Sequence, residues 1–352
     1  MTLDEYGWDA RWAAAFAPYA ADAEPGRVTQ HHRTHYLLAT AAGEVAGVVT
    51  GKLLHEAAAK LDLPVVGDWV ALRRHAGSAA TIHAVLPRRG QFIRKAPGIR
   101  LEPQVISANV DTVLLLVGLD GNFSLARIER YLAAAGESGA RPVVLLTKAD
   151  LCPETADRLA AARAVAGRTP VHAISAPLAV GLAAVQACLA PGETAALLGS
   201  SGVGKSTLLN ALLGEEIQRT REVRAGDSKG RHATTHRQLF RLPSGALMLD
   251  TPGMRELQLW EADEGVADTF ADIEALAARC RYADCRHAGE DGCALAAALA
   301  DGRITPRRWA SFQKLRRELA FLASREDDAE YRARKRREKA LGKAIKRLKQ
   351  GR

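Results

Sequence analysis

Residues 195–213 read AALLGSSGVGKSTLLNALL, and this stretch decides the fold of the chain. Its first four residues are apolar and predict a strand, its centre has the pattern G-x-x-x-x-G-K-S, and its end predicts a helix. Glycines in such a loop turn backbone N–H groups toward a polyphosphate, and the helix start adds partial positive charge. The predicted phosphate contacts are Gly199, Ser200, Ser201, Gly202, Val203, Gly204, Lys205, Ser206 and Thr207.

Two side chains of this loop and a later segment predict a magnesium site. Lys205 can reach the outer phosphates, and Ser206 offers a hydroxyl to Mg²⁺. The apolar run 246–249 leads into the sequence D-T-P-G, in which Asp250 can hold the magnesium shell and Gly253 lets the backbone approach the terminal phosphate. We therefore expect Mg²⁺ to bind together with the nucleotide.

A segment upstream of the phosphate loop has the composition of a guanine site. The apolar run 142–146 leads into Thr147, Lys148, Ala149 and Asp150, which match the pattern N/T-K-x-D. The Asp150 carboxylate can accept two N–H bonds from the edge of guanine. Adenine lacks that pair of donors, so GTP is favoured over ATP.

A second upstream segment completes the nucleotide motifs. The apolar run 170–174 ends in Ser175 and Ala176, a pair that resembles the loop closing over guanine in GTPases. Every motif follows a predicted strand, but the base-reading loop precedes the phosphate loop, an order rotated relative to Ras. This combination resembles the RsgA (YjeQ) family, circularly permuted GTPases that act on the small ribosomal subunit in bacteria. The resemblance implies GTP and GDP as ligands, and the small ribosomal subunit and its rRNA as partners.

The segment before D-T-P-G resembles the switch of that family. Residues 230–236, GRHATTH, are similar to the family's G-R-H-T-T-T, with alanine in place of the first threonine. A switch threonine completes the magnesium shell in GTPases, and Thr234 is the first candidate, with Thr235 as the alternative. Met254 stands where Ras-like GTPases carry a glutamine that orients water, so His232 is the candidate for that task. The alternatives are a surface histidine without a catalytic role, or another switch residue.

Three cysteines and one histidine lie within fourteen residues, as Cys280, Cys285, His287 and Cys293. Three thiolates and one imidazole satisfy tetrahedral Zn²⁺ without an open position, so one structural zinc ion per chain is predicted. The alternative is a small helical core with reduced cysteines. The spacing also matches the zinc-binding pattern of the family, and the resemblance implies the same four ligands.

Length and patterning predict three domains after a short extension. The 352 residues are 47% hydrophobic, which is ample for several buried cores. Aromatic residues at helical spacing mark the extension, short strands predict a small RNA-binding barrel, and alternating strands and helices predict an α/β domain. The expected parts are a helical extension (1–26), an OB-fold barrel (27–100), a circularly permuted P-loop GTPase domain (105–260), and a mostly helical zinc-binding domain with a basic helical tail (261–352).

The charge of the chain points to a polyanionic partner. The net charge is +9, and residues 331–352 hold eleven Lys and Arg against one acid. A tail lying on RNA phosphates is predicted, with a solvated terminal helix as the alternative. A second RNA surface, or else a solvated basic linker, could be formed by Arg88, Arg89, Arg94, Lys95 and Arg100. No apolar run is long enough for a membrane span and the start is no signal peptide, so we expect a cytoplasmic protein. We also expect a monomer.

The residues and the resemblance together predict a GTP hydrolase, an enzyme that cleaves a phosphoric anhydride. Binding to the small ribosomal subunit would couple hydrolysis to late subunit assembly and to release of the protein itself. The alternative from another class is a nucleotide-gated RNA-binding adaptor or chaperone with negligible turnover. An ATP-dependent kinase would explain neither residues 147–150 nor the cysteine cluster.

Overall fold

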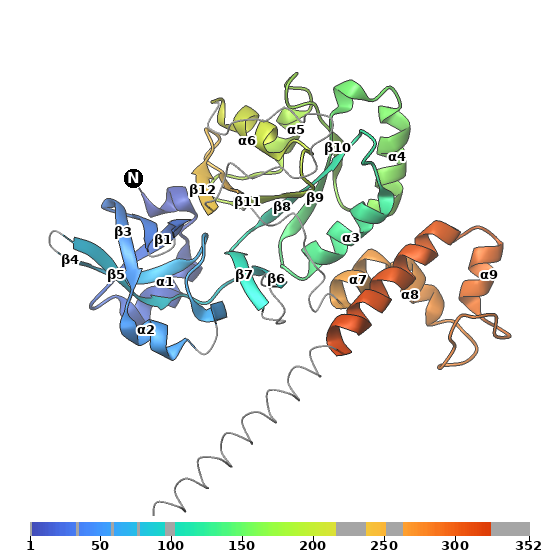
Figure 1. Ribbon diagram of the computed structural model, residues 1–352, viewed down its shortest axis with the longest axis horizontal. Helices are drawn as coiled ribbons and strands as arrows, with labels where there is room; N and C mark the ends of the chain where they lie inside the picture. Colours follow the sequence, from blue (N-terminus) through green and yellow to red (C-terminus); the bar gives the residue numbers. More distant parts are fainter. Residues whose placement is uncertain are drawn as a thin grey trace, which may run out of the picture.

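The computed structural model describes residues 2–32, 35–57, 60–75, 78–95, 103–215, 237–250 and 263–324. Figure 1 shows a barrel at the amino end, a central α/β domain, and a helical module beside helix α3. This arrangement agrees with the predicted fold class of barrel, α/β domain and helical domain. Within the described parts of the chain, no helix combines the length and apolarity that a bilayer crossing needs.

The aromatic stripe of the first residues packs onto the barrel but does not form one long helix. Gly7 adopts φ 81° and ends a short 3-10 turn, and the Asp9 side chain then caps a new helix at the Trp12 N–H. The rings of Trp8 and Trp12 lie 4.7 and 6.2 Å from that of Trp69. The elements are η1 (Leu3–Tyr6), α1 (Ala10–Phe16) and η2 (Ala17–Tyr19).

Five strands close the predicted small barrel. They follow the order β1-β2-β3-β5-β4, and β1 pairs with β4 to close the ring. The barrel encloses the fully buried Val28, Leu38, Trp69 and Ile82. Its elements are β1 (Glu24–His31), β2 (Tyr36–Thr40), β3 (Gly43–Val49), α2 (Gly51–Glu56), η3 (Lys60–Asp62), β4 (Trp69–His75) and β5 (Ser78–Val85). Strand β1 thus begins inside the predicted extension.

A two-stranded hairpin follows the barrel, and the central domain follows the hairpin. Parallel strands in the order β10-β9-β8-β11-β13 form the central sheet, with β12 antiparallel to β13. The strands are β6 (Gln91–Lys95) and β7 (Pro103–Ala108) in the hairpin, then β8 (Thr112–Gly118), β9 (Arg141–Thr147), β10 (Val171–Ala173), β11 (Thr194–Gly199), β12 (Arg237–Arg241) and β13 (Leu247–Asp250).

Helices cover both faces of the central sheet, which explains why its strands β8 and β11 are buried along their whole length. Alternate residues of β8 enter separate cores: Val113, Leu115 and Val117 pack in one, and Leu114 and Leu116 in the other. The first core contains residues of α3 and α4, the second residues of α5 and α6. These helices are α3 (Leu125–Gly136), α4 (Thr155–Ala166), α5 (Leu182–Ala187) and α6 (Lys205–Leu213), with the turn η4 at Ala149–Leu151.

Strand β12 joins the barrel to the central sheet. It pairs with β13 on one side and with β1 on the other, where Gln30 lies opposite Gln238 and His31 opposite Arg237. The two domains therefore share one continuous 11-stranded sheet. Residue 237, where β12 begins, directly follows the predicted switch residues 230–236, so the switch leads straight into the junction with the barrel.

The carboxyl-terminal module is helical and is held on α3 by ion pairs. It contains α7 (Asp263–Thr269), α8 (Ala271–Ala277), α9 (Ala294–Ala300) and the helical residues 306–324. Glu129 of α3 is fully buried and accepts bonds of 2.9 to 3.0 Å from Arg307 and Arg308. Arg130 forms two bonds of 2.6 Å with Glu318. Because a buried carboxylate needs such partners, these contacts fix the module to the central domain.

Replacing Gly265 with alanine should destabilise the protein. A Cβ at Gly265 of α7 would lie 2.0 Å from the Ala133 carbonyl oxygen of α3, and that backbone atom cannot move aside alone. We expect a loss of about 1–3 kcal/mol in the free energy of unfolding, measured by chemical denaturation. Gly51→Ala is the control, since open space surrounds Gly51. Equal stability of the Gly265 variant and wild type would contradict this tight helix contact.

Candidate nucleotide-binding site and metal centre

The predicted phosphate loop connects β11 to α6. Strand β11 ends at Gly199 and α6 begins at Lys205. Gly202 and Gly204 have φ values of 71° and 104°, in the left-handed region that favours glycine. The Lys205 ammonium donates to the carbonyl oxygens of Gly199 and Ser200 at 2.6 and 2.7 Å. Positive charge therefore lies over the loop, beside the amino end of a nine-residue helix, as anion binding requires.

The base-reading segment is tied to the phosphate loop by a hydrogen bond. The buried Thr147 hydroxyl donates to the Val203 carbonyl oxygen at 2.7 Å, so threonine at this position links the two loops directly. Lys148 adopts the left-handed conformation with φ 62°. The Ala149 N–H donates to the Ile174 carbonyl oxygen at 3.1 Å, which brings the second guanine segment alongside. These bonds place the three predicted loops around one position.

Two acceptors in these loops have the chemistry of a base pocket. Asp150 lies in the turn η4 with its side chain exposed. Ser175 is 1% exposed, and its buried hydroxyl has no hydrogen-bond partner among the described residues. Buried hydroxyls normally have a partner, and this unpaired one lies beside the predicted base-reading loop. Ala176 follows it at the edge of the second core.

Asp250 lies at the same edge of the sheet as the phosphate loop. It is the last residue of β13, which runs parallel to β11 in the register Ala196 opposite Leu249. Ligands of α/β sheets bind beyond the carboxyl ends of the strands, and every predicted nucleotide residue that the structure describes lies there. The other predicted nucleotide and switch residues, Gly253, His232 and Thr234, lie outside the described residues.

The four predicted metal ligands come together in the carboxyl-terminal module. The ligand atoms of Cys280, Cys285, His287 and Cys293 all lie within 4.8 Å of one another. Separations are 3.9 Å between the Cys280 and Cys293 sulfurs, and 3.5 and 3.6 Å from these sulfurs to the His287 Nδ1 atom. Tetrahedral zinc would place sulfurs about 3.8 Å apart and sulfur about 3.6 Å from nitrogen. The cluster therefore fits a metal ion of that size.

The local structure explains how this loop holds its shape. His287 adopts φ 60°, and Gly289 and Gly292 also have positive φ, so the chain reverses direction sharply. The Cys293 sulfur accepts the Ala296 N–H and caps α9. The His287 ring packs edge-on against Trp309 at 6.0 Å, which connects the cluster to the helical residues 306–324.

Arg88 and Arg89, candidates for an RNA surface, make structural contacts instead. The Arg88 guanidinium forms two bonds of 2.8 Å with the fully buried Asp68 and donates to the carbonyls of Leu61 and Leu63. Arg89 pairs with Asp9, and its guanidinium lies 4.5 Å above the Trp12 ring. Both arginines join the barrel to its neighbours, which leaves little of their charge for a polyanion.

Of the other RNA candidates, Arg94 and Lys95 lie on β6, while Arg100 and residues 331–352 lie outside the described residues.

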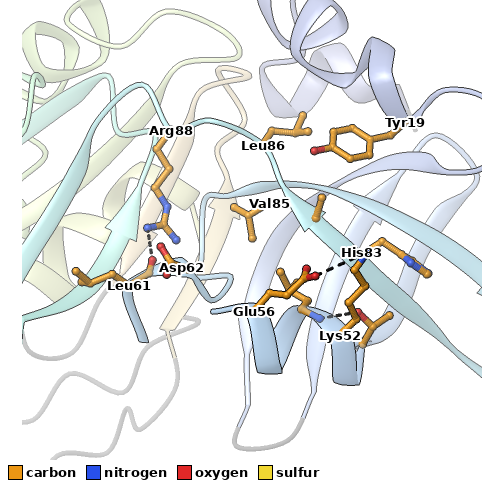
Figure 2. A pocket seen from close by; sticks show the side chains of 12 residues that line it. Tyr19, Lys52, Glu56, Leu61, Asp62, His83, Val85, Leu86 and Arg88 are labelled. Atoms are coloured by element: carbon orange, nitrogen blue, oxygen red, sulfur yellow. Dashed lines mark hydrogen bonds and ion pairs between the residues drawn. The ribbon is translucent and has the colours of Figure 1, made fainter. Parts of the chain in front are cut away.

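The barrel carries an open cavity of about 810 Å³ that is separate from the nucleotide motifs. Figure 2 shows Tyr19 and Leu86 opposite Lys52 and Glu56, with Val85 between them. Lys52 and Glu56 form an exposed ion pair at 3.8 Å, so the local charge is balanced. No residue of the predicted nucleotide motifs lines this cavity.

Fold and site together define a circularly permuted GTPase with a P-loop at the carboxyl edge of a parallel sheet. Residues 85–260 match the RsgA GTPase family. The chain belongs to this family.

Relatives resemble the chain along most of its length. It is 51% identical over 338 residues to the small ribosomal subunit biogenesis GTPase RsgA of Opitutus terrae, covering 93% of this chain and 92% of that relative. A protein of the same name from Syntrophotalea carbinolica is 41% identical over 359 residues, covering 99% and 98%.

Two solved structures share the fold. The crystal structure of YjeQ from Thermotoga maritima has a TM-score of 0.62 at 24% identity, covering 85% of this chain and 99% of that one. That of YloQ, described as a circularly permuted GTPase, has a TM-score of 0.61 at 22% identity, covering 87% and 96%.

Proposed function

We propose that this protein hydrolyses GTP on the small ribosomal subunit and couples hydrolysis to late subunit assembly and to its own release. The observation that carries the proposal is 51% identity, over 93% of the chain, to a relative named for small ribosomal subunit biogenesis. The bond between Thr147 and Val203 supports it, because this bond joins a guanine-type loop to a phosphate loop.

In this proposal, different described residues bind the base, the phosphates and the magnesium ion. Asp150 reads the guanine edge and Ser175 lies beside the base. The phosphate loop and Lys205 hold the phosphates. Ser206 and Asp250 would hold Mg²⁺, which supplies charge neutralisation at the phosphates when bound.

The proposed metal of the cysteine cluster is one structural Zn²⁺ per chain. Three thiols and one imidazole leave a tetrahedral ion without an open position, so the site stabilises the module and takes no part in the reaction. Its ligands come from one short loop that packs against Trp309.

The proposed partner contacts follow from charge. Residues 331–352, with eleven basic residues, would lie on rRNA phosphates, where each neutralised phosphate releases counterions. The protein would act as a cytoplasmic monomer, in the compartment where subunits are assembled.

We expect slow GTP hydrolysis by the free protein and fast hydrolysis on the small subunit. Met254 cannot orient water, so the subunit must order the switch and bring His232 toward the attacking water, with Thr234 on the magnesium ion. Single-turnover hydrolysis with and without small subunits measures this. His232→Ala should lose about 10²- to 10⁴-fold of the stimulated rate while still binding GTP and the subunit.

His236→Ala is the companion variant for this experiment, since it tests the other histidine of the same segment as the group that orients the water. If His232→Ala keeps the full subunit-stimulated rate of GTP hydrolysis, another group orients the attacking water. If wild-type protein binds subunits and GTP but shows no stimulated turnover, the nucleotide-gated adaptor is the better description.

A further inference from the structure

Asp120 lies at the nucleotide edge of the sheet but belongs to none of the nucleotide motifs. It follows the end of β8, and β8 lies between β9, which leads to the base-reading loop, and β11, which leads to the phosphate loop. The Asp120 carboxylate accepts a bond of 2.7 Å from the Lys148 ammonium. Lys148 therefore extends from the end of β9 across the end of β8, toward the side of the phosphate loop.

The turn that presents Asp120 is built by several hydrogen bonds. The Asn122 N–H donates to the Asp120 carboxylate at 2.9 Å, and the Leu119 N–H donates to the Thr147 carbonyl at 2.9 Å. Arg158 of α4 donates to the Leu119 carbonyl at 3.0 Å and lies over the Phe123 ring. The carboxylate is thus fixed in place rather than free to rotate in solvent.

Gly118 packs closely against the Asp120 carboxylate. A Cβ at Gly118 would lie 2.9 Å from the Asp120 Oδ1 atom, so glycine lets the carboxylate fold back over the strand end. Burial would raise the pKa of Asp120, but the bonds from Lys148 and the Asn122 N–H outweigh it and lower the pKa. The Asp120 carboxylate is therefore charged at neutral pH.

An acid at this position requires an explanation, because a carboxylate near a polyphosphate repels it. Lys148 carries the compensating charge, and both side chains are less than a third exposed, at 28% and 29%. Lys148 also holds a left-handed backbone conformation, which neighbouring contacts must stabilise in a non-glycine residue. The Asp120 contact fixes the far end of this side chain.

We propose that Asp120 is a positioning residue of the nucleotide site, which stretches the Lys148 stem into an apolar platform for the face of the purine nucleoside. The inference rests on the proposed GTP site. Asp150 reads the base edge, whereas this platform contacts the face and does not distinguish one purine from another. Fixing the lysine before binding lowers the entropy lost on binding, which typically corresponds to about threefold to tenfold in affinity per side chain.

The test measures affinities of wild type and Asp120→Ala for GDP and IDP by competition with a fluorescent GDP analogue. We expect both nucleotides to bind about threefold to tenfold more weakly to the variant, by the same factor, because the platform is indifferent to the base edge. Lys148→Ala should lose affinity too, and the double variant should lose little more, since both changes remove one platform. Asp157→Ala, which removes an exposed acid of α4, is the charge control.

If Asp120 acted only through its negative charge, its removal would strengthen nucleotide binding. The direction of the change in affinity therefore distinguishes the two explanations. Tighter or unchanged binding by Asp120→Ala, or fully additive losses in the double variant, would overturn the proposal. Gly118→Ala keeps the acid but displaces it and should weaken binding in the same direction, which guards against a folding defect of Asp120→Ala. Wild-type protein that binds no guanine nucleotide would refute the proposed function instead.

Discussion

Asp150→Asn is expected to convert the guanine site into a xanthine site. The carboxylate would accept the two N–H donors of guanine, whereas asparagine offers one acceptor and one donor, the complement of xanthine. GTP loses two hydrogen bonds to a charged group, so its affinity should fall by about 10²- to 10⁴-fold. XTP should bind the variant more tightly than GTP does. Competition between the two nucleotides for wild type and variant measures this change.

The fold supports a local effect of this substitution. Asp150 is exposed in η4, and the segment is held by Thr147 and Ala149 through bonds that the substitution leaves intact. Asp157→Asn makes the same chemical change at another exposed acid and should leave the preference for GTP unaltered. An unchanged preference in Asp150→Asn would remove this residue from the base site.

Loss of the metal is expected to unfold the carboxyl-terminal module while the central domain remains able to bind nucleotide. Where ligands gather only in the folded state, metal-binding free energy becomes folding free energy. Elemental analysis should find one zinc ion per chain, and Cys285→Ser should lose it together with the helical signal of the module. Cys188→Ala, which changes a cysteine outside the cluster, should keep the metal.

The interface with α3 explains why nucleotide binding should survive. Glu129 pairs with Arg307 and Arg308 of the module, and we expect unfolding of the module to expose this carboxylate to water rather than leave it buried alone. Chelated protein that keeps its helical content and melts at the same temperature would show that the cluster has no structural role.

The nucleotide loops and the cysteine cluster could be predicted because their information is local. The segment 199–206 needs only glycines, a lysine and a flanking strand and helix, and the four residues of the cysteine cluster lie within fourteen residues. The barrel and the parallel sheet were likewise predictable from the spacing of apolar residues, since strand period and burial are properties of short segments. Within the expected helical extension, an α-helix covers only Ala10–Phe16, because Gly7 ends the preceding 3-10 turn and the Asp9 side chain starts a new helix.

Other features depend on residues that meet only in the folded chain. No motif marks Asp120; its one signal is that it follows an apolar strand, yet its partner Lys148 is 28 residues away. Likewise, the sequence left Arg88 as a candidate for RNA binding, but in the folded chain it pairs with Asp68. Glu129 pairs with Arg307, which lies 178 residues later in the sequence.

The sequence by itself determined the class of the protein, the positions of the candidate nucleotide loops and the cysteine cluster, because short patterns encode backbone geometry and donor chemistry. Only the tertiary structure decided that β12 joins the barrel to the central sheet and that Gly265 of α7 contacts α3. It also decided which charged side chains form ion pairs within the protein. The physical reason is that burial and pairing are set by neighbours in space, and those neighbours are distant along the chain.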